Sequence, residues 1–361
     1  MKIVCLIDNL SAGGAQRQMV MLAKLLKQNG HDITILTYYP HDFFLQEVLD
    51  FGIRYKCIEE SRPLYRIIKI RRELRLLKEG LVVAFLKTPV LLAELSSLPY
   101  KKWKLIVSER NADARNDRQL IFRRLLHTLS DYVVVNSYTN QELISKNAPW
   151  LKNVRTIYNC VDSEYFSPGV CKKKEKSNNR LKVVAIGKYS SQKNIIGLIR
   201  ALDYTIKNYE INIQIDWYGD KVLGSDVYKN AEKEIKRLNL NNIFFLHGPS
   251  KLILDIYRKS SVIILPSFYE GVPNVICEAM SCGLPILASD INDNSRFITS
   301  GVNGYLFNPY DEIDISNAMI EFFKLTESSR ELMGLSSREK AKRIFGKDVF
   351  ISEYLEIINT L

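Results

Sequence analysis

Short apolar runs rich in β-branched residues alternate with longer amphipathic segments along most of the chain. This alternation is typical of βαβ units and predicts parallel sheets covered by helices. It predicts strands at residues 3–7, 33–37, 81–86, 105–107 and 132–136 and, after a break, at 181–187, 213–219, 243–248, 262–266 and 285–289. The fold class expected is therefore α/β, with two Rossmann-like doubly wound domains, whose ligands bind beyond the carboxyl ends of the strands. Two such domains predict a ligand in the cleft between them.

A polar run with Pro168, Gly169 and several lysines separates the two sets of strands and reads as a linker. The length of 361 residues also favours two domains, because single cores stop growing at roughly 250–300 residues. We expect an N-terminal domain at 1–165, a linker at 166–180 and a C-terminal domain at 181–345. Residues 346–361 are predicted to form a helix that packs back toward the N-terminal domain.

The positive charge of the chain is concentrated in its first half. The net charge is +11, and residues 1–165 hold 25 Lys and Arg against 17 Asp and Glu. Segments 62–78 and 117–126 place many of these cations beside apolar residues, a pattern typical of helices that lie on anionic membranes. An ordinary crossover helix that covers the sheet would explain the apolar side equally, and a solvated surface would explain the charge. No nucleic-acid-binding module accompanies the charge, so nucleic acid is not the partner expected.

The cysteines and the longest apolar region indicate a cytoplasmic protein. The six cysteines form no CxxC pair and no zinc-spaced cluster, so we expect reduced core thiols. The apolar start of the chain is too short for a signal peptide. Lys87, Pro89 and Glu94 interrupt the longest apolar region, 81–98, which therefore cannot supply the ~20 residues of a membrane span. Any membrane contact is expected to be peripheral.

Two strand ends carry residues suited to a diphosphate. Gly13 and Gly14 follow the first strand and precede a helix, where glycine lets the backbone approach a diphosphate or a sugar. A plain strand-to-helix turn is the alternative. Lys188 and Lys193 follow residues 181–187, and two lysines on one loop can neutralise a diphosphate leaving group. They could equally be solvated surface charges.

The segment 267–283 carries the strongest pattern. It follows an apolar strand, places Glu270 on a loop, opens a helix near Asn274 and sets Glu278 one turn into that helix. Carboxylates accept hydrogen bonds from vicinal hydroxyls, and a helix N-terminus favours phosphate. A sugar and a ribose on either side of a diphosphate would satisfy all of these groups.

These motifs together resemble glycosyltransferase family 4, whose members have the GT-B fold. The resemblance covers nearly the whole chain, and the Glu270-x7-Glu278 spacing is the mark of that family. Further matching segments, in order, are Gly13-Gly14, 108–111, 157–162, 192–194 and 301–307.

The resemblance implies a role for each matching residue. Glu278 is expected to bind the ribose hydroxyls, Glu270 the hydroxyls of the transferred sugar, and Lys188 and Lys193 the diphosphate. Gly13 and Gly14 are expected to close over the reaction centre from the other domain. Lys193, Lys188 and Glu270 are then the catalytic residues, and the donor-binding segment also includes Gly271, Val272, Pro273, Asn274 and Val275.

The resemblance also implies a retaining hexosyltransferase that acts without a metal or other cofactor. The chain has no D-x-D motif, and the lysines and the helix N-terminus can supply the positive field instead. We expect a nucleotide diphosphate sugar donor, with UDP as the base. The expected acceptor is lipid-linked or a glycan in bacterial polysaccharide assembly (lipopolysaccharide, O-antigen or capsule), at the cytoplasmic face of the inner membrane.

One position departs from the family pattern. Arg110 stands where many relatives have histidine, and arginine stays protonated at any working pH, so it is no proton acceptor. Arg110 and Asn111 are instead candidates for binding an anionic acceptor. Two alternatives remain open: a non-catalytic scaffold that binds nucleotide sugar or lipid, and a nucleotide-sugar epimerase on the same architecture.

Overall fold

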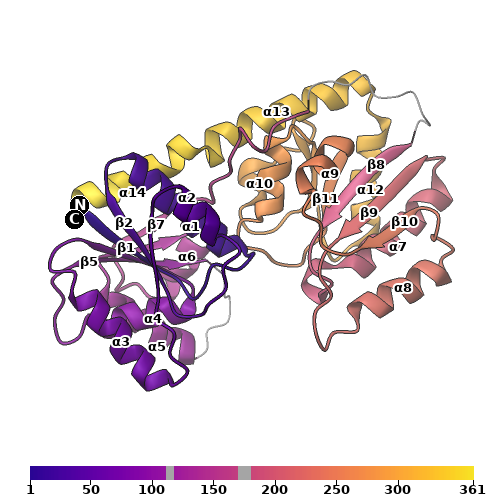
Figure 1. The fold of residues 1–361 in the computed structure, drawn as a ribbon. Coiled ribbons are helices and arrows are strands. Elements are labelled where there is room, and N and C mark those ends of the chain that lie inside the picture. Colours follow the sequence, from indigo (N-terminus) through magenta and orange to yellow (C-terminus); the bar gives the residue numbers. More distant parts are fainter. Residues whose placement is uncertain (111–117, 170–179) are drawn as a thin grey trace. The chain divides into compact units, whose positions relative to one another are not determined.

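The computed structural model describes residues 1–110, 118–169 and 180–361, which form two compact units (Figure 1). The first unit comprises Met1–Cys160 and Lys347–Leu361, and the second comprises Val161–Gly346. The chain therefore enters the second unit before residue 165, where the first domain is predicted to end. Asn111 and most of the predicted linker lie outside the described residues.

The first unit is built on a seven-stranded parallel sheet of order β3-β2-β1-β4-β5-β6-β7. Successive residues of its strands point to opposite faces, and both faces are buried, as expected for a parallel sheet. In the central strand β4 every residue is buried. The strands are β1 (Lys2–Leu6), β2 (Asp32–Thr37), β3 (Arg54–Cys57), β4 (Leu81–Phe85), β5 (Lys104–Glu109), β6 (Tyr132–Val135) and β7 (Val154–Thr156).

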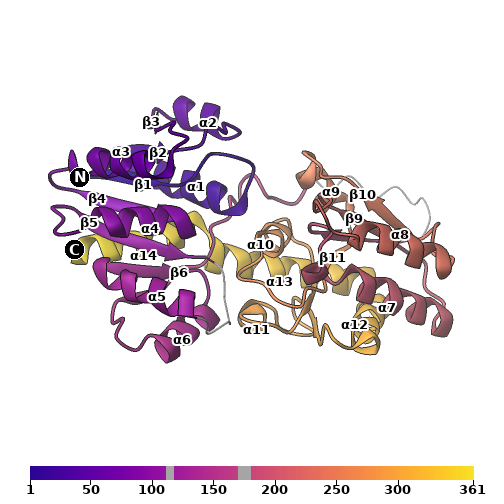
Figure 2. The same ribbon diagram turned by 90° about the horizontal axis from the view of Figure 1, so that it is seen from below.

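Helices cover both faces of this sheet (Figures 1 and 2). One face packs against α1 (Gly14–Gln28) and against the last helix of the chain, α14 (Lys347–Thr360), which contributes Phe350, Tyr354 and Ile357 to the core. The other face packs against α3 (Pro63–Arg75), α4 (Lys87–Ser96) and α6 (Tyr138–Asn147). The unit is completed by α2 (Leu45–Asp50), α5 (Arg118–Leu126) and the 3-10 turn η1 (His127–Leu129).

The second unit repeats the architecture with a six-stranded parallel sheet of order β10-β9-β8-β11-β12-β13. Its largest cluster of buried apolar residues lies beneath the helices α7, α8 and α12. The strands are β8 (Leu181–Ile186), β9 (Ile213–Tyr218), β10 (Phe244–His247), β11 (Val262–Leu265), β12 (Ile286–Ser289) and β13 (Gly304–Phe307). The helices are α7 (Ile195–Asn208), α8 (Val227–Arg237), α9 (Ile253–Lys259), α10 (Asn274–Ser281), α11 (Asn294–Phe297), α12 (Glu312–Lys324) and α13 (Glu327–Phe345), and η2 (Ser191–Lys193) is a 3-10 turn.

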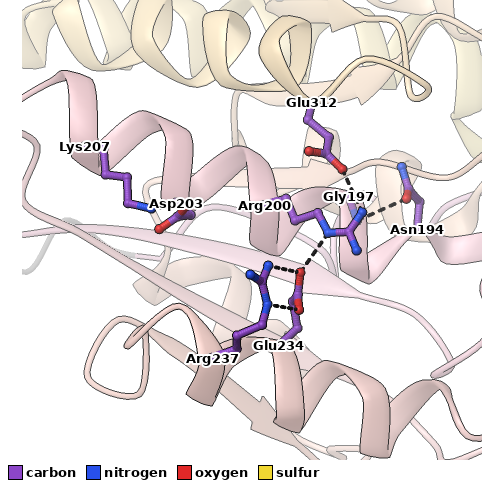
Figure 3. Close-up of polar contacts among 8 residues, drawn as sticks. All are labelled: Asn194, Gly197, Arg200, Asp203, Lys207, Glu234, Arg237 and Glu312. Atoms are coloured by element: carbon purple, nitrogen blue, oxygen red, sulfur yellow. Dashed lines mark hydrogen bonds and ion pairs between the residues drawn. The ribbon is translucent and has the colours of Figure 1, made fainter.

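Charged side chains connect the outer sides of α7, α8 and α12 (Figure 3). Arg200 on α7 contacts Glu234 on α8 at 2.8 Å and Glu312 at the start of α12 at 3.3 Å, and Arg237 also contacts Glu234. Arg200 and Arg237 hold the pKa of Glu234 at about 2, although burial opposes the shift. The two arginines are 48% and 62% exposed, so each pair is worth little, but their shared partner Glu234, 13% exposed, makes a network that connects the three helices.

The predicted α/β class, with two doubly wound parallel-sheet domains, is confirmed. Three strands escape the sequence pattern, namely β3, β7 and β13, which have three or four residues each. β3 has the sequence Arg-Tyr-Lys-Cys and β7 the sequence Val-Arg-Thr, and neither contains a buried apolar run. They form strands because each can hydrogen-bond to a neighbouring strand. This pairing depends on the sheet and not on the local sequence.

Candidate active site

The loop that follows β8 positions Lys193 in the second unit. The loop passes through η2, and Asn194 then begins α7 in the left-handed conformation, with φ 53°. The side chain of Asn194 accepts a hydrogen bond from Gly197 N at 3.3 Å (Figure 3). It also donates one to Pro309 O at 2.8 Å. This capping ties Lys193 to the start of a well-packed helix.

Close backbone contacts fix the neighbouring strand ends. A Cβ atom on Gly219, just after β9, would lie 2.0 Å from Gly187 O, so no larger residue fits there. Trp217 Nε1 donates a hydrogen bond to the same carbonyl oxygen at 2.8 Å. The stem of Lys193 also lies against Gly187. The carboxyl ends of β8 and β9 are thereby packed tightly beside the lysine.

The loop after β11 carries Glu270 and is joined to the Lys193 loop by polar contacts. Gln192 Nε2 donates to Tyr269 O at 2.8 Å, and Phe268 N donates to Gln192 O at 2.9 Å. Asn292 Nδ2 donates to the backbone oxygen of Glu270. Two segments 77 residues apart in sequence are therefore held as one structure.

Lys193 and Glu270 form an ion pair between these two loops, with Lys193 Nζ donating to Glu270 Oε1. Both side chains are mostly buried, 16% and 11% exposed, so the pair is screened less than a surface pair. In the predictions from sequence, Lys193 binds the diphosphate and Glu270 binds the transferred sugar. The structure brings them together, and a ligand that takes one of them must change the partner of the other.

The helix α10 begins beside this pair. Its N-cap is Pro273, whose side chain cannot accept a hydrogen bond from the first turn. Helix N-termini carry a partial positive charge that suits a phosphate group. Val272 and Pro273 are buried and Asn274 and Val275 half-buried, so this segment is partly sheltered from water.

Glu278 lies on α10 and is almost fully buried, with 6% of its surface exposed. Tyr257 on α9 donates a hydrogen bond to Glu278 Oε2 at 3.0 Å. Tyr257 is itself fully buried and packs edge-on against Phe166. The sequence analysis missed Tyr257, because a tyrosine in an amphipathic helix looks like an ordinary core residue.

Not every predicted residue joins this cluster. Lys188 is exposed on the loop between β8 and η2, and Gly271 is half-buried between Glu270 and the start of α10. Gly13 and Gly14 lie in the first unit, where Gly13 is the N-cap of α1 and Gly14 its first residue. Side chains of Asp8 and Gln16 meet beside them, 3.2 Å apart.

Arg110 lies at the end of β5 and is engaged within the first unit. Its guanidinium donates to Asn159 Oδ1 and lies over the ring of Phe85, 4.6 Å from the centroid. Burial lowers the pKa of Arg110, although the hydroxyl of Tyr354 on α14 opposes the shift. Arg110 therefore has a structural role in the first unit, in addition to its predicted role in binding the acceptor. Asn111 lies outside the described residues.

Four buried charged side chains meet beside Arg110, and the sequence did not predict them as a group. His127 Nδ1 hydrogen-bonds Glu94 Oε1, and His127 Nε2 lies 3.5 Å from Glu109 Oε2. Arg124 Nη2 lies 3.7 Å from Glu109 Oε1, and each of these side chains is at most 5% exposed. The segment 117–126 was expected to be a basic surface patch, but Arg124 is inside the unit.

The pKa values in this cluster follow from its geometry. Burial lowers the pKa of His127, but hydrogen bonds and charges from Glu109 and Glu94 outweigh burial and raise it to about 9. Burial raises the pKa of Glu109, but His127 and Arg124 lower it further than burial raises it. At neutral pH His127 is therefore protonated and Glu109 ionised.

Within the part of the chain that the structure describes, no three His, Cys, Asp or Glu side chains are grouped so that they could hold a metal ion. Five cysteines in that part, all but Cys171, are free thiols. No described helix combines the length and the apolar character needed to cross a bilayer.

Comparisons with known proteins agree with the fold and the motifs. The family model "Glycosyltransferase Family 4" matches residues 12–165, and "Glycosyl transferases group 1" matches residues 171–339. The chain therefore belongs to glycosyltransferase family 4, and it is a glycosyltransferase.

Relatives match the chain along nearly its whole length. One is the Campylobacter jejuni GalNAc-alpha-(1->4)-GalNAc-alpha-(1->3)-diNAcBac-PP-undecaprenol alpha-1,4-N-acetyl-D-galactosaminyltransferase, 24% identical over 95% of this chain and 94% of that protein. Another is the amylovoran biosynthesis glycosyltransferase AmsD of Erwinia amylovora, 25% identical over 99% of each. The crystal structure of Anabaena HepE in complex with UDP matches with a TM-score of 0.86, at 18% identity over 100% of both chains.

Proposed function

We propose that this chain is a retaining, metal-independent hexosyltransferase that moves a sugar from a UDP-sugar to a lipid-linked acceptor in bacterial surface polysaccharide assembly. The observation that carries the proposal is the pairing of Lys193 with Glu270 beside the N-terminus of α10, with Glu278 one turn further on. A cation, a helix N-terminus and two carboxylates are the groups that a nucleotide diphosphate sugar needs.

In this proposal each group has a separate task. Glu278, held by Tyr257, accepts hydrogen bonds from the ribose hydroxyls. The N-terminus of α10, with Lys193 and the exposed Lys188, stabilises the diphosphate as it leaves. When Lys193 turns to the phosphate, Glu270 is released to accept hydrogen bonds from the transferred sugar. Positive charge preorganised around a leaving phosphate is an effective means of lowering the barrier to transfer.

The names of the relatives support the choice of substrates. The Campylobacter relative is named for an acceptor on undecaprenol diphosphate, and AmsD for the synthesis of amylovoran. The HepE structure was solved with UDP. A lipid-linked acceptor supports the proposal that the chain acts at the cytoplasmic face of the inner membrane.

The helix α3 supports peripheral contact with an anionic membrane. Ile70 and Leu74 are buried against the sheet, as expected of a crossover helix. Leu64, Tyr65 and Ile68 are exposed, however, by 73%, 51% and 60%. An exposed apolar set among arginines and lysines suits the interface of an anionic bilayer.

Vesicle sedimentation tests the membrane contact. We expect the protein to sediment with vesicles that contain anionic lipid at low salt, and to be released as the salt concentration rises. Ile68→Ser should weaken sedimentation, whereas Leu332→Ser, at a residue equally exposed on α13, should not. Equal binding to neutral vesicles would count against an electrostatic contact.

Thermal stabilisation by UDP-, GDP-, ADP- and CMP-sugars tests the donor site, with and without EDTA. A donor at ~100 times its dissociation constant should add about 2.7 kcal/mol to the free energy of unfolding. Selective, EDTA-insensitive stabilisation that is lost in Glu278→Ala would support the site, and no response to any donor would refute it. The anomeric configuration of the product, read by NMR, then tests retention.

A further inference from the structure

A small pocket opens in the first unit at the carboxyl ends of β4 and β5. In doubly wound sheets, ligands bind beyond the carboxyl ends of the strands, so a pocket at this edge is well placed for a substrate. All of its lining residues belong to the first unit. Its charged or polar lining residues are Lys87, Ser108, Glu109, Arg110, Arg123 and His127.

A buried hydroxyl at this pocket has no hydrogen-bond partner. Ser108 is 2% exposed, and among the described residues its Oγ makes no hydrogen bond. His127 is equally buried, but its Nε2 faces Glu109 Oε2 at 3.5 Å. Because a buried polar group without a partner is costly, a ligand that accepts a hydrogen bond from Ser108 Oγ would be favoured.

The charge around the pocket is unbalanced in favour of an anion. Glu109 pairs with Arg124, which is not among the lining residues, and Glu94 pairs with His127. The described lining adds two further guanidinium groups, those of Arg110 and Arg123. Cations concentrated at the mouth of a partly buried site attract an anion more strongly than the same cations on an open surface.

We propose that this pocket binds a phosphate-type oxyanion, and that Ser108 Oγ donates a hydrogen bond to it. Arg110 and Arg123 supply the positive field, and His127 belongs to the lining. The source of the oxyanion is the diphosphate of the lipid-linked acceptor, and this assignment rests on the proposed function. The oxyanion site itself rests only on the pocket, so the two can fail separately.

Histidine ring NMR offers a direct test. The chain has four histidines, His31, His41, His127 and His247. The protein is labelled with 15N at histidine. Single His→Gln variants at the other three positions identify the ring signals of those three histidines, so the remaining signal is that of His127. None of these variants alters the buried cluster around His127. UDP is kept at saturation so that the donor site is occupied, and inorganic pyrophosphate is then titrated.

We expect pyrophosphate to shift the His127 signal and to leave that of His247, in the second unit, unchanged. Arg123→Gln should weaken the pyrophosphate affinity about tenfold or more, because it removes one charge from the lining. Arg72→Gln removes the same charge from an exposed position on α3 of the same unit and should change the affinity little. No shift of the His127 signal, or equal effects of the two variants, would overturn the site.

A second titration identifies the source of the oxyanion. A short-chain polyprenyl diphosphate sugar should shift the same signal at a lower concentration than pyrophosphate if the acceptor diphosphate occupies the pocket. If pyrophosphate alone shifts it, the site stands but the acceptor assignment is wrong. Thermal stabilisation by UDP-sugars is measured separately, so failure of the donor site is recognised independently of either result.

Discussion

The cluster around His127 in the first unit consists of buried charged side chains that pair with one another, whereas in the second unit Lys193 and Glu270 sit on loops held by backbone groups and side-chain amides. His127 and Glu94 are each 2% exposed, against 16% and 11% for Lys193 and Glu270. A buried pair resists rearrangement, because removing either partner leaves a charge without compensation. A pair on loops can exchange partners when a ligand arrives. The difference predicts that substitutions in the first cluster mainly change stability, and those in the second mainly change turnover.

The largest effect is expected from Glu94→Gln. This isosteric change leaves the protonated His127 beside a neutral partner, and breaking a buried pair costs about 3–5 kcal/mol of the free energy of unfolding. Urea unfolding at pH 7 measures the loss. Glu47→Gln, which breaks the surface pair with Lys24, is the matched control and should cost less than about 1 kcal/mol. Similar losses in both variants would contradict the proposed difference between buried and exposed pairs.

Lys193→Ala should act on turnover and not on stability. Loss of one group that stabilises a leaving phosphate is expected to lower kcat by about 10²–10³, or roughly 3–4 kcal/mol in the activation free energy. Initial rates are measured with the donor found by thermal stabilisation and a polyprenyl diphosphate sugar as acceptor. Lys207→Ala removes an exposed lysine paired with Asp203 and should leave the rate unchanged. Near-normal turnover in Lys193→Ala would rule out its assigned role.

The free energy of unfolding should fall as the pH rises from neutral into the alkaline range. The pKa of His127 is about 9 in the folded chain, above its ordinary value of 6.5. The stabilisation from its protonated form is therefore complete below pH 6.5 and is lost as the pH rises through 9. At about 1.36 kcal/mol for each pH unit, the contribution is at most about 3–4 kcal/mol.

Urea unfolding at pH 6 and at pH 9.5 measures this dependence. His127→Gln should reduce the difference between the two pH values, because glutamine does not titrate. His247→Gln, which removes the half-exposed partner of Asp216, is the matched control. A wild-type difference that survives unchanged in His127→Gln would show that another group is responsible.

Of these substitutions, Tyr257→Phe is expected to have the smallest effect, and this effect should be on donor binding. The change removes the hydrogen bond to Glu278 Oε2 while keeping the ring in the core, so we expect about 0.5–1.5 kcal/mol, or up to tenfold. The KM for the donor should rise while kcat changes little. Tyr204→Phe, at an exposed position on α7, is the control. An unchanged donor KM would mean that Tyr257 supports the fold and not the carboxylate.

The prediction of the fold succeeded where the sequence pattern is strongest. The buried strands β1, β4 and β11 are continuous apolar runs, and parallel strands must be apolar because both faces are covered. The start of α10 at Asn274 also lies where the sequence placed it. The short strands β3 and β7 have no such run and became recognisable only in the sheet.

The sequence predicted the residues of the candidate site but not the side chains that hold them in place. Glu270, Glu278 and Lys193 were predicted because they follow apolar strands, suit hydroxyls and diphosphate, and match the motifs that resemble the family. Tyr257 and Asn292, which hold Glu278 and the Glu270 loop, come from other segments and carry no signal of their own. Their roles depend on contacts made 21 or 22 residues away along the chain.

The two parallel-sheet domains, the family and the residue types at the strand ends could be predicted, because periodicity and local spacing are recorded in consecutive residues. The pairing of the charges became apparent only in the folded chain. His127, Glu94, Glu109 and Arg124 lie on four different segments and read as surface or core residues one at a time. Charge interactions depend on distance and burial in space, and neither quantity is recorded in the order of residues along the chain.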